Sequence, residues 1–230
     1  MTLSELQEGK ILLVDKPLTW TSFDVVNKIR WNIRNSFDIK KIKVGHAGTL
    51  DPQATGLLIV CTGKATRKIN LIQRQEKVYT GIIKLGAVTP SYDTETDESE
   101  LFPTDHITGE TVREVSQQFL GEINQSPPLF SALRKEGKRL YEWARKGIEV
   151  EVTPRRVRIE EFKINEIEMP YVNFSARCGK GTYLRSLAYD FGKALRSGGY
   201  LTSLRRERIG NFSVENAYPS LLKNNYLLQE

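Results

Sequence analysis

The hydrophobic and polar positions in the first third of the chain predict two strands and two helices. The apolar run at 11–14 predicts a strand that ends at Asp15-Lys16-Pro17, and the run at 57–61 predicts a second, buried strand. Between the two strands, Thr21 and Asp24 have the spacing of a helix capping box. The helix that follows carries an apolar stripe formed by Phe23, Val26, Ile29 and Ile33. A second helix is expected over 65–73, because Gly63 ends the strand before it.

The remaining pattern predicts further strands and three more helices, one of them a short helix with Leu140, Trp143 and Ala144 on one face. Strands are expected over 77–86, 155–164, 171–178 and 200–212, and a helix over 111–121. The strand at 171–178 alternates, with Val172, Phe174, Ala176 and Cys178 on one side. A helix within 179–195, capped by Thr182, buries Leu184, Leu187, Ala188, Phe191 and Leu195. This distribution predicts an α+β protein built on a mixed, mostly antiparallel sheet.

Composition changes this picture in two respects, compartment and partner. None of the apolar runs approaches the roughly 20 residues that span a bilayer, and no secretory signal is visible, so we expect a cytoplasmic protein. The net charge of +6 favours a polyanionic partner only weakly. Positive charge is concentrated at 133–147 and 153–158, with Tyr141 and Trp143 interleaved. This stretch is either a solvated helix face or a surface that follows phosphates, and the sequence favours neither.

Several common sites are excluded by their missing motifs. Gly63-Lys64-Ala65 lacks the spacing of a phosphate-binding loop, and no G-x-S-x-G hydrolase motif occurs. Two histidines and two distant cysteines predict neither a zinc site nor a disulfide framework. The acidic stretch 89–100 lacks the glycine that a calcium loop needs at its sixth position, and it is expected to be a solvated loop.

The loop "GHAGTLDPQATG" (45–56) contains the strongest candidate for chemistry, Asp51. Its glycines allow tight turns, and Pro52 keeps Asp51 extended. The alternative is an ordinary turn in which Asp51 bonds its own backbone. Arg185 favours a functional role, because a cation at the third position of a helix capped by Thr182 opposes the helix dipole. A neighbouring carboxylate would compensate, so we predict an ion pair between Asp51 and Arg185.

Six stretches in the same order resemble the motifs of the bacterial tRNA pseudouridine-55 synthases, the TruB-type family. They are "LLVDKPLTWTSFDVV", "GHAGTLDPQATGLLIVCTGKATR", "KVYTGIIKLG", "SPPLFSALRKEGKRLYEWARKG", "CGKGTYLRSLAYDFG" and "LTSLRRERIGNF". The resemblance covers nearly the whole chain. It implies a single catalytic domain over 1–230, with a pseudouridine-synthase sheet and an RNA-gripping thumb insertion at about 124–152. Too few residues follow Phe212 for an RNA-binding PUA domain, so this domain is expected to be absent or vestigial at 213–230.

The same resemblance assigns roles to individual residues. It implies that Asp51 is the catalytic aspartate, that Arg185 is its ionic partner and that Tyr79 stacks on the target base. It further implies a substrate-binding group, which consists of His46 in the RNA-binding loop, Leu204 at the uracil pocket, and Lys16, Gly48 and Lys180 near the site. From the residues alone, the favoured interpretation is that Tyr79 and Leu204 are core residues and that Lys16 is a surface charge in a turn.

The implied reaction converts uridine 55 in the T-loop of tRNA to pseudouridine by moving the glycosidic bond from N1 to C5. It needs no cofactor and no metal, and the implied partner is the T-arm and elbow of tRNA. Neither a membrane nor an obligate protein partner is expected, and the protein is expected to be a monomer. Two other classes stay open, a non-catalytic RNA-binding module and a metal-free hydrolase that resembles a glycosidase.

Overall fold

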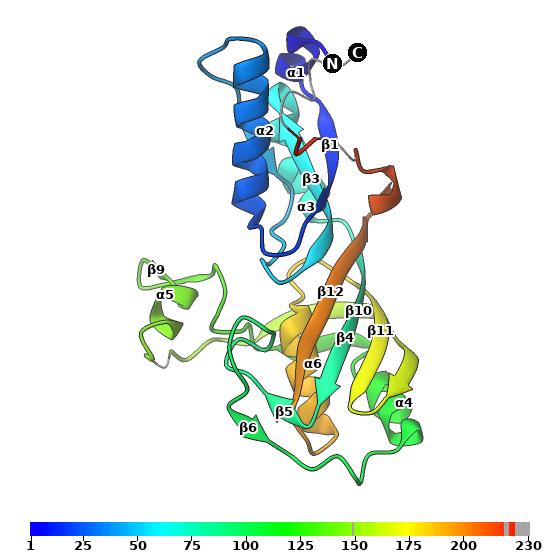
Figure 1. The fold of residues 1–230 in the computed structure, drawn as a ribbon. Coiled ribbons are helices and arrows are strands. Elements are labelled where there is room, and N and C mark those ends of the chain that lie inside the picture. Colours follow the sequence, from blue (N-terminus) through cyan, green and yellow to red (C-terminus); the bar gives the residue numbers. More distant parts are fainter. Residues whose placement is uncertain (149, 219–220, 224–230) are drawn as a thin grey trace. The chain divides into compact units, whose positions relative to one another are not determined.

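The computed structural model describes residues 1–148, 150–218 and 221–223 of the 230-residue chain (Figure 1). The helices are α1 (Leu3–Glu8), α2 (Ser22–Ser36), α3 (Ile69–Gln73), α4 (Gly109–Gln117), α5 (Leu140–Ala144) and α6 (Leu184–Ala194), with short 3-10 helices η1 (Gly63–Lys68) and η2 (Val214–Asn216). The strands are β1 (Ile11–Lys16), β2 (Val44–His46), β3 (Thr55–Thr62), β4 (Lys77–Leu85), β5 (Ala87–Val88), β6 (Glu100–Leu101), β7 (Gly121–Gln125), β8 (Arg134–Lys135), β9 (Lys138–Arg139), β10 (Arg155–Glu168), β11 (Tyr171–Cys178), β12 (Gly199–Ile209) and β13 (Phe212–Ser213).

The fold is α+β, with a mixed, mostly antiparallel sheet flanked by helices, as predicted. The chain forms two compact units. The first consists of Met1–Tyr79 and Arg205–Glu230, and the second of Thr80–Leu204. Strands β4 and β12 contribute residues to both units. The single catalytic domain expected over 1–230 stays a prediction, and each unit is described by itself below.

The first unit is organised around β3, which is buried on both faces. Strands β1 and β2 both pair antiparallel with β3. Strand β12 pairs parallel with the first two residues of β3, Thr55 and Gly56. Because side chains alternate along a strand, Leu58 and Val60 face a core shared with α1, β1 and α2. Leu57 and Ile59 face a second core that includes η1, α3 and Ile209. The loop between β2 and β3 is thus attached to a strand that is fixed from two sides.

Helix α2 confirms the capping prediction and corrects the predicted apolar stripe. Thr21 is the N-cap and Asp24 completes the capping box. Phe23, expected to face the core, is 63% exposed, and Val25 is buried in its place. Val25 fits because it lies next to Val26 and four residues before Ile29, so these three side chains form one face of the helix. The sequence does not predict α1, β2 or η2 of this unit, nor the 3-10 geometry of η1.

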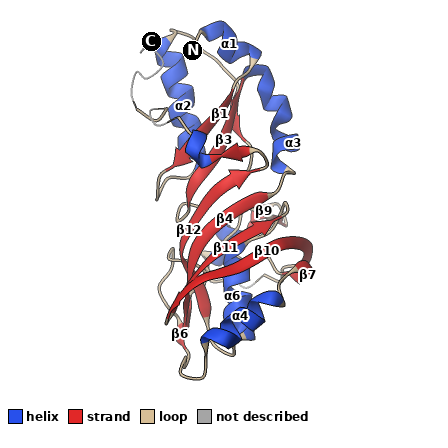
Figure 2. Cartoon of the chain, turned by 90° about the vertical axis from the view of Figure 1, so that its right-hand side faces the viewer, coloured by secondary structure: helices blue, strands red, loops and turns tan. Residues whose placement is uncertain are grey.

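The second unit packs its helices against an aromatic core. Its strands follow the order β12-β4-β11-β10-β7, and β10 pairs antiparallel with both β11 and β7. The alternation predicted for β11 is confirmed, because Val172, Phe174, Ala176 and Cys178 are all buried. The ring of Phe162 lies edge-on to those of Phe119, Phe174 and Phe191, which come from three different segments. Helices α4 and α6 lie beside each other in this unit (Figure 2).

Helix α6 begins later than the sequence predicts. The predicted cap, Thr182, donates its hydroxyl to the Gly179 carbonyl instead, and Tyr183 is the N-cap. The N-terminus of the helix is held by Gln125 of β7. The Gln125 side chain accepts from the Tyr183 N–H at 2.8 Å and donates to the Tyr183 carbonyl at 3.1 Å. Arg185 is therefore the second residue of the helix, and it remains in the first turn.

The predicted thumb, 124–152, extends away from the sheet of the second unit (Figure 1). It contains β8, β9 and α5, and Leu140 is its buried anchor. Cations lie over two of its aromatic rings, Lys138 over Trp143 at 4.8 Å and Arg145 over Tyr141 at 5.4 Å. Residue 149 of the thumb lies outside the described residues, as do 219, 220 and 224–230 of the tail in which a vestigial PUA domain was considered.

Candidate active site

The loop that carries Asp51 connects β2 to β3, and Ser22 holds the residue before Asp51. Ser22 is the first residue of α2. Its hydroxyl accepts from the Leu50 N–H at 2.8 Å and donates to the Leu50 carbonyl at 3.0 Å. Ser22 and Leu50 are both buried, so both backbone groups of Leu50 would lack water if this hydroxyl were removed.

Lys16 holds the residue after Asp51. It ends β1 with a fully buried side chain, and its Nζ donates to the carbonyls of Pro17 at 2.9 Å, Trp20 at 2.6 Å and Pro52 at 3.4 Å. Burial lowers the pKa of Lys16 to about 8, although the nearby charge of Asp51 acts in the opposite direction. The interpretation of Lys16 as a surface charge in a turn is therefore wrong.

A third support of the loop is Arg206 of β12, which the sequence analysis missed. Its side chain is 1% exposed. Its Nε donates to the Leu57 carbonyl at 2.7 Å, Nη1 to the Thr49 carbonyl at 3.2 Å and Nη2 to the Gly48 carbonyl at 3.1 Å. The adjacent Arg205 pairs with Asp15 and is more exposed. The signal that could have identified Arg206 is the pair of arginines in a strand, because alternation turns one of the two inward.

These contacts define the environment of Asp51, whose side chain is half-buried. The Asp51 carbonyl accepts from the Ala54 N–H at 3.1 Å, which closes a turn. Gly48 has a φ of 116°, a conformation that favours glycine. His46 ends β2 rather than lying in the loop, and burial, followed by the charge of Arg206, lowers its pKa. The first unit therefore places Asp51, Lys16, His46 and Gly48 around one loop.

The second unit holds Arg185, whose side chain is 4% exposed. Its Nε lies 3.6 Å from Oδ2 of Asp93, which is 7% exposed. Nη1 donates to the Ser91 carbonyl at 3.1 Å and Nη2 to the Phe130 carbonyl at 2.9 Å. The negative charge of Asp93 compensates the unfavourable interaction between the Arg185 cation and the positive end of the helix dipole.

Asp93 was missed because the stretch 89–100 was expected to be a solvated loop, and that expectation is wrong for Ser91 and Asp93. Both are buried, and the Asp93 carbonyl accepts from the hydroxyls of Thr89 at 2.7 Å and Ser91 at 3.2 Å. Oδ1 of Asp93 accepts from the Glu95 N–H at 2.9 Å. This local network turns a polar stretch inward, which composition alone does not indicate.

The other predicted residues are placed in one unit or the other. Tyr79 of β4 belongs to the first unit and is 8% exposed, and Leu204 of β12 belongs to the second and is 9% exposed. Lys180 is exposed in the turn before α6. Asp51 and Arg185 belong to different units. The ion pair between Asp51 and Arg185, and the joint site with Tyr79, Leu204 and Lys180, therefore stay predictions.

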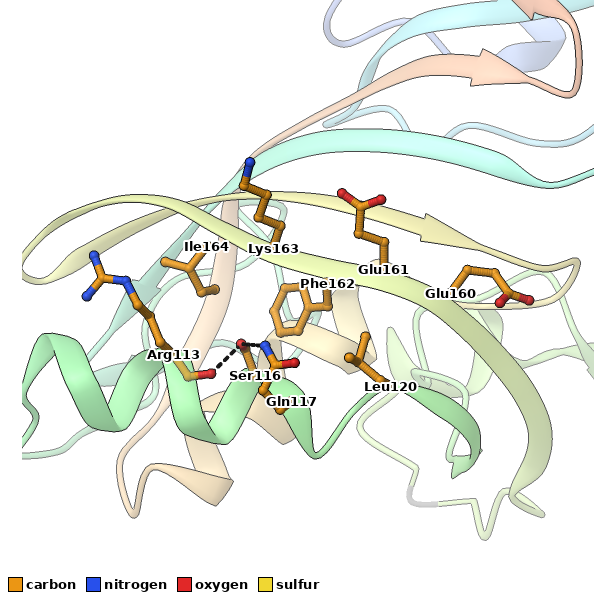
Figure 3. A pocket seen from close by; sticks show the side chains of 9 residues that line it. All are labelled: Arg113, Ser116, Gln117, Leu120, Glu160, Glu161, Phe162, Lys163 and Ile164. Carbon is orange, nitrogen blue, oxygen red and sulfur yellow. Dashed lines mark hydrogen bonds between the residues drawn. The ribbon is translucent and has the colours of Figure 1, made fainter.

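A hollow elsewhere in the second unit does not contain these residues. It has a volume of about 370 Å³ and lies between α4 and β10 (Figure 3). Phe162 points toward α4, whereas Glu161 and Lys163 point to the other side of the strand. Within the described residues, no three His, Cys, Asp or Glu side chains form a set that could hold a metal ion. No helix in the described ranges has the length and apolar content of a membrane span.

The fold first defines the class of protein. It matches the archaeal box H/ACA Nop10–Cbf5 complex with a TM-score of 0.68 and 26% identity, over 99% of this chain and 57% of the solved one. It matches a Cbf5–Nop10–Gar1 complex with a TM-score of 0.66 and 30% identity, over 91% of this chain and 51% of the solved one. The chain thus spans little more than half the length of these solved chains. The chain therefore shares its fold with the matching chains of these two complexes.

Sequence relatives then define the family. The family model described as "TruB family pseudouridylate synthase (N terminal domain)" matches residues 34–184. The tRNA pseudouridine synthase B of Flavobacterium johnsoniae is 55% identical over 94% of this chain and 95% of its own length. That of Parabacteroides distasonis is 52% identical, over 90% and 88%. The chain belongs to the TruB family of pseudouridylate synthases, and it is therefore an isomerase.

Proposed function

We propose that this pseudouridine synthase acts on tRNA and converts uridine 55 of the T-loop. The observation that carries the proposal is the Asp51 loop, in which Ser22, Lys16 and Arg206 hold the backbone on both sides of one carboxylate. A pure RNA-binding module needs no such fixed carboxylate. Relatives named tRNA pseudouridine synthase B match almost the whole chain, which supports tRNA as the substrate.

The chemical roles follow from the nature of the reaction. Asp51 starts it by attacking C1′, by adding to C6 of the uracil, or by removing the 2′ proton, and these three routes stay open. Arg185 pairs with Asp51 and orients its carboxylate toward the target nucleotide. The target uridine is flipped out of its folded arm, which costs a few kcal/mol. Stacking on Tyr79 offsets part of this cost.

The remaining predicted residues form the RNA side of the site. Leu204 lines the uracil pocket, while His46, Gly48 and Lys180 contact the RNA. His46 is neutral at physiological pH, because its pKa is lowered, so it contacts RNA by packing and hydrogen bonding rather than by charge. The thumb supplies phosphate contacts. We further propose that the protein acts as a cytoplasmic monomer without an obligate protein partner.

A labelled T-arm minihelix tests this proposal. We expect the wild type to release tritium from C5-labelled uridine without free uracil. Asp51→Asn should lower the single-turnover rate at least about 1000-fold, since removing a group that acts in the transition state costs that order of rate. It should bind the RNA nearly as tightly as the wild type. Asp105→Asn is the matched control, because Asp105 is exposed in the other unit.

Each other outcome identifies a different class. Free uracil would indicate a hydrolase, and RNA binding without tritium release would indicate a binding module. Tritium release from positions other than 55 in full-length tRNA would overturn the position but not the reaction. Loss of RNA binding in Asp51→Asn would contradict the role assigned to Asp51.

A further inference from the structure

One segment of the first unit has a higher formal net charge than the whole chain. Residues 28–68 contain nine Lys or Arg and two Asp, a formal net charge of +7, whereas the whole chain carries +6. The rest of the chain therefore has a formal net charge of −1, the basic thumb included. This segment contains the end of α2, the connection to β2, and η1.

The cations of this segment line two neighbouring hollows. The first has a volume of about 490 Å³ and is lined by Arg30, Arg34, Lys40, Lys41, Ile42 and Lys43. The second has a volume of about 310 Å³, and its cations are Lys41, Lys43, Lys64 and Arg67. Both hollows share the segment 41–43, which forms the ridge between them. We call the two hollows with this ridge the basic groove.

Most cations of the groove are available to a ligand. Arg34, Lys40, Lys41 and Lys43 are exposed, and among the described residues none of them forms an ion pair. Arg30 is fixed instead, since Nη1 donates to Oδ1 of Asn27 at 2.7 Å and Nη2 to the Val44 carbonyl at 3.1 Å.

Two acids lie near the groove and do not neutralise it. Glu8 is paired with Lys64 at 2.8 Å at one end, and Asp38 is the single acid between Arg34 and Lys40. Positive charges held close together in a concave surface repel each other, and a bound polyanion reduces this repulsion. Binding also releases the counterions that surround the polyanion, which favours the complex.

The groove is continuous along the chain with the candidate active site. Lys43 is followed directly by β2, which ends at His46, and the Asp51 loop begins there. At about 3.3 Å per residue, this three-residue strand places the groove roughly 10 Å from His46. An RNA loop that reaches His46 and Asp51 would therefore have its adjoining stem within reach of the groove.

We propose that the basic groove binds the phosphate backbone of the stem that adjoins the target loop. The inference rests on the proposed function, in which the substrate is a folded tRNA. Lysine side chains contact phosphates as point charges on flexible stems, so the groove contributes affinity and orientation rather than base recognition. Ile42 is the single apolar residue that lines the larger hollow, which disfavours a membrane surface as the ligand.

Salt-dependent binding of full-length tRNA tests the groove. The variant Lys40→Gln/Lys41→Gln/Lys43→Gln removes three charges, and Lys163→Gln/Lys193→Gln/Arg196→Gln removes three exposed charges from the other unit as a control. Between about 50 and 200 mM salt, we expect the groove variant to raise Kd at least about tenfold and to reduce the slope of log K against log salt by about 2–3. The effect falls on Kd, and the single-turnover rate at saturating tRNA is retained.

The outcomes separate this inference from the proposed function. Equal Kd values and salt slopes for the groove variant and the control would overturn the groove. Vesicles of phosphatidylglycerol that bind the wild type, together with unchanged tRNA binding by the groove variant, would assign the groove to a membrane instead. A wild type that binds tRNA without forming pseudouridine would refute the proposed function, while the binding comparison would still decide the groove. Lys41→Gln alone, which removes one ridge charge, should reduce the slope by about 0.9.

Discussion

Two buried arginines, one in each unit, are held in different ways. Arg206 donates to three backbone carbonyls, and among the described residues it forms no ion pair. Arg185 donates to two carbonyls and also lies 3.6 Å from the Asp93 carboxylate. Both side chains are almost fully buried.

The difference separates a residue that shapes a loop from one suited to chemistry. A buried cation that contacts only carbonyls fixes the path of the backbone, and here it fixes Gly48, Thr49 and Leu57 around Asp51. A buried cation beside a carboxylate belongs to a charge network, so its electrostatic effect extends to any further anion that approaches it. The comparison therefore predicts that Arg206 controls stability first and that Arg185 controls activity first.

The largest effect on stability is expected for Arg206→Leu. The substitution removes the donor of the buried Leu57 carbonyl and of the Gly48 and Thr49 carbonyls, so the free energy of unfolding should fall by about 3–4 kcal/mol. Urea denaturation measures this change. The matched variant Arg205→Gln breaks ion pairs with Asp15 and Glu207 whose side chains are 29–47% exposed, and it should cost less than about 1 kcal/mol. Equal losses in the two variants would contradict the role given to Arg206.

An intermediate loss of stability with a large loss of activity is expected for Asp93→Asn. The change keeps the shape of the side chain and removes the charge that faces Arg185, so the free energy of unfolding should fall by about 2 kcal/mol. Turnover should fall at least about tenfold, because the orientation of Arg185 is disturbed. Asp97→Asn, in the exposed part of the same loop, is the control. If turnover falls only in proportion to the folded fraction, Asp93 has a structural role alone.

The smallest effect depends on pH and concerns Lys16. Its pKa is about 8 in the folded protein and about 10.5 when unfolded, so the unfolded chain binds more protons between these values. Stability from this group therefore rises with pH above about 8. The advantage of the wild type over Lys16→Met should grow by about 1–2 kcal/mol between pH 7.5 and 9.5.

Urea denaturation at the two pH values measures this difference. Asp51→Asn should move the rise in stability to lower pH, because the Asp51 charge raises the pKa of Lys16. A pH-independent difference between the wild type and Lys16→Met would show that Lys16 is not buried as a charged group.

The sequence predicts the core well and the supports of the site poorly. The alternation in β11 and the helical spacing of Leu184, Leu187, Ala188 and Phe191 are local signals, and all of these residues are buried. Ser22, Asp93 and Arg206 act through partners 28, 92 and up to 158 positions away, and no local pattern encodes such pairs. Phe23 is the opposite case, a residue that the sequence places in the core and that is exposed. Helical spacing alone does not show which of two neighbouring faces of α2 packs against the sheet.

The candidate site was predicted where residue type and chain geometry coincide. Asp51 is singled out by a loop that leads into a buried strand, and Arg185 by a charge that its helix disfavours, and their site roles stay predictions. Lys16 was misjudged from the residues alone because a lysine beside a proline is typical of a solvated turn. Its three carbonyl partners become visible only when β1, α2 and the Asp51 loop are packed together.

The contacts of Arg206 also determine when, during translation, the Asp51 loop can reach its final conformation. The residue that fixes the path of this loop is translated 149 positions after Leu57, its nearest partner in the chain. At a synthesis rate of roughly 5–20 residues per second, this separation corresponds to about 8–30 s. A nascent chain on the ribosome thus carries Asp51 long before it carries Arg206. Completion of the loop is consequently a late event of translation, which delays the encounter of a competent enzyme with its RNA until β12 has been made.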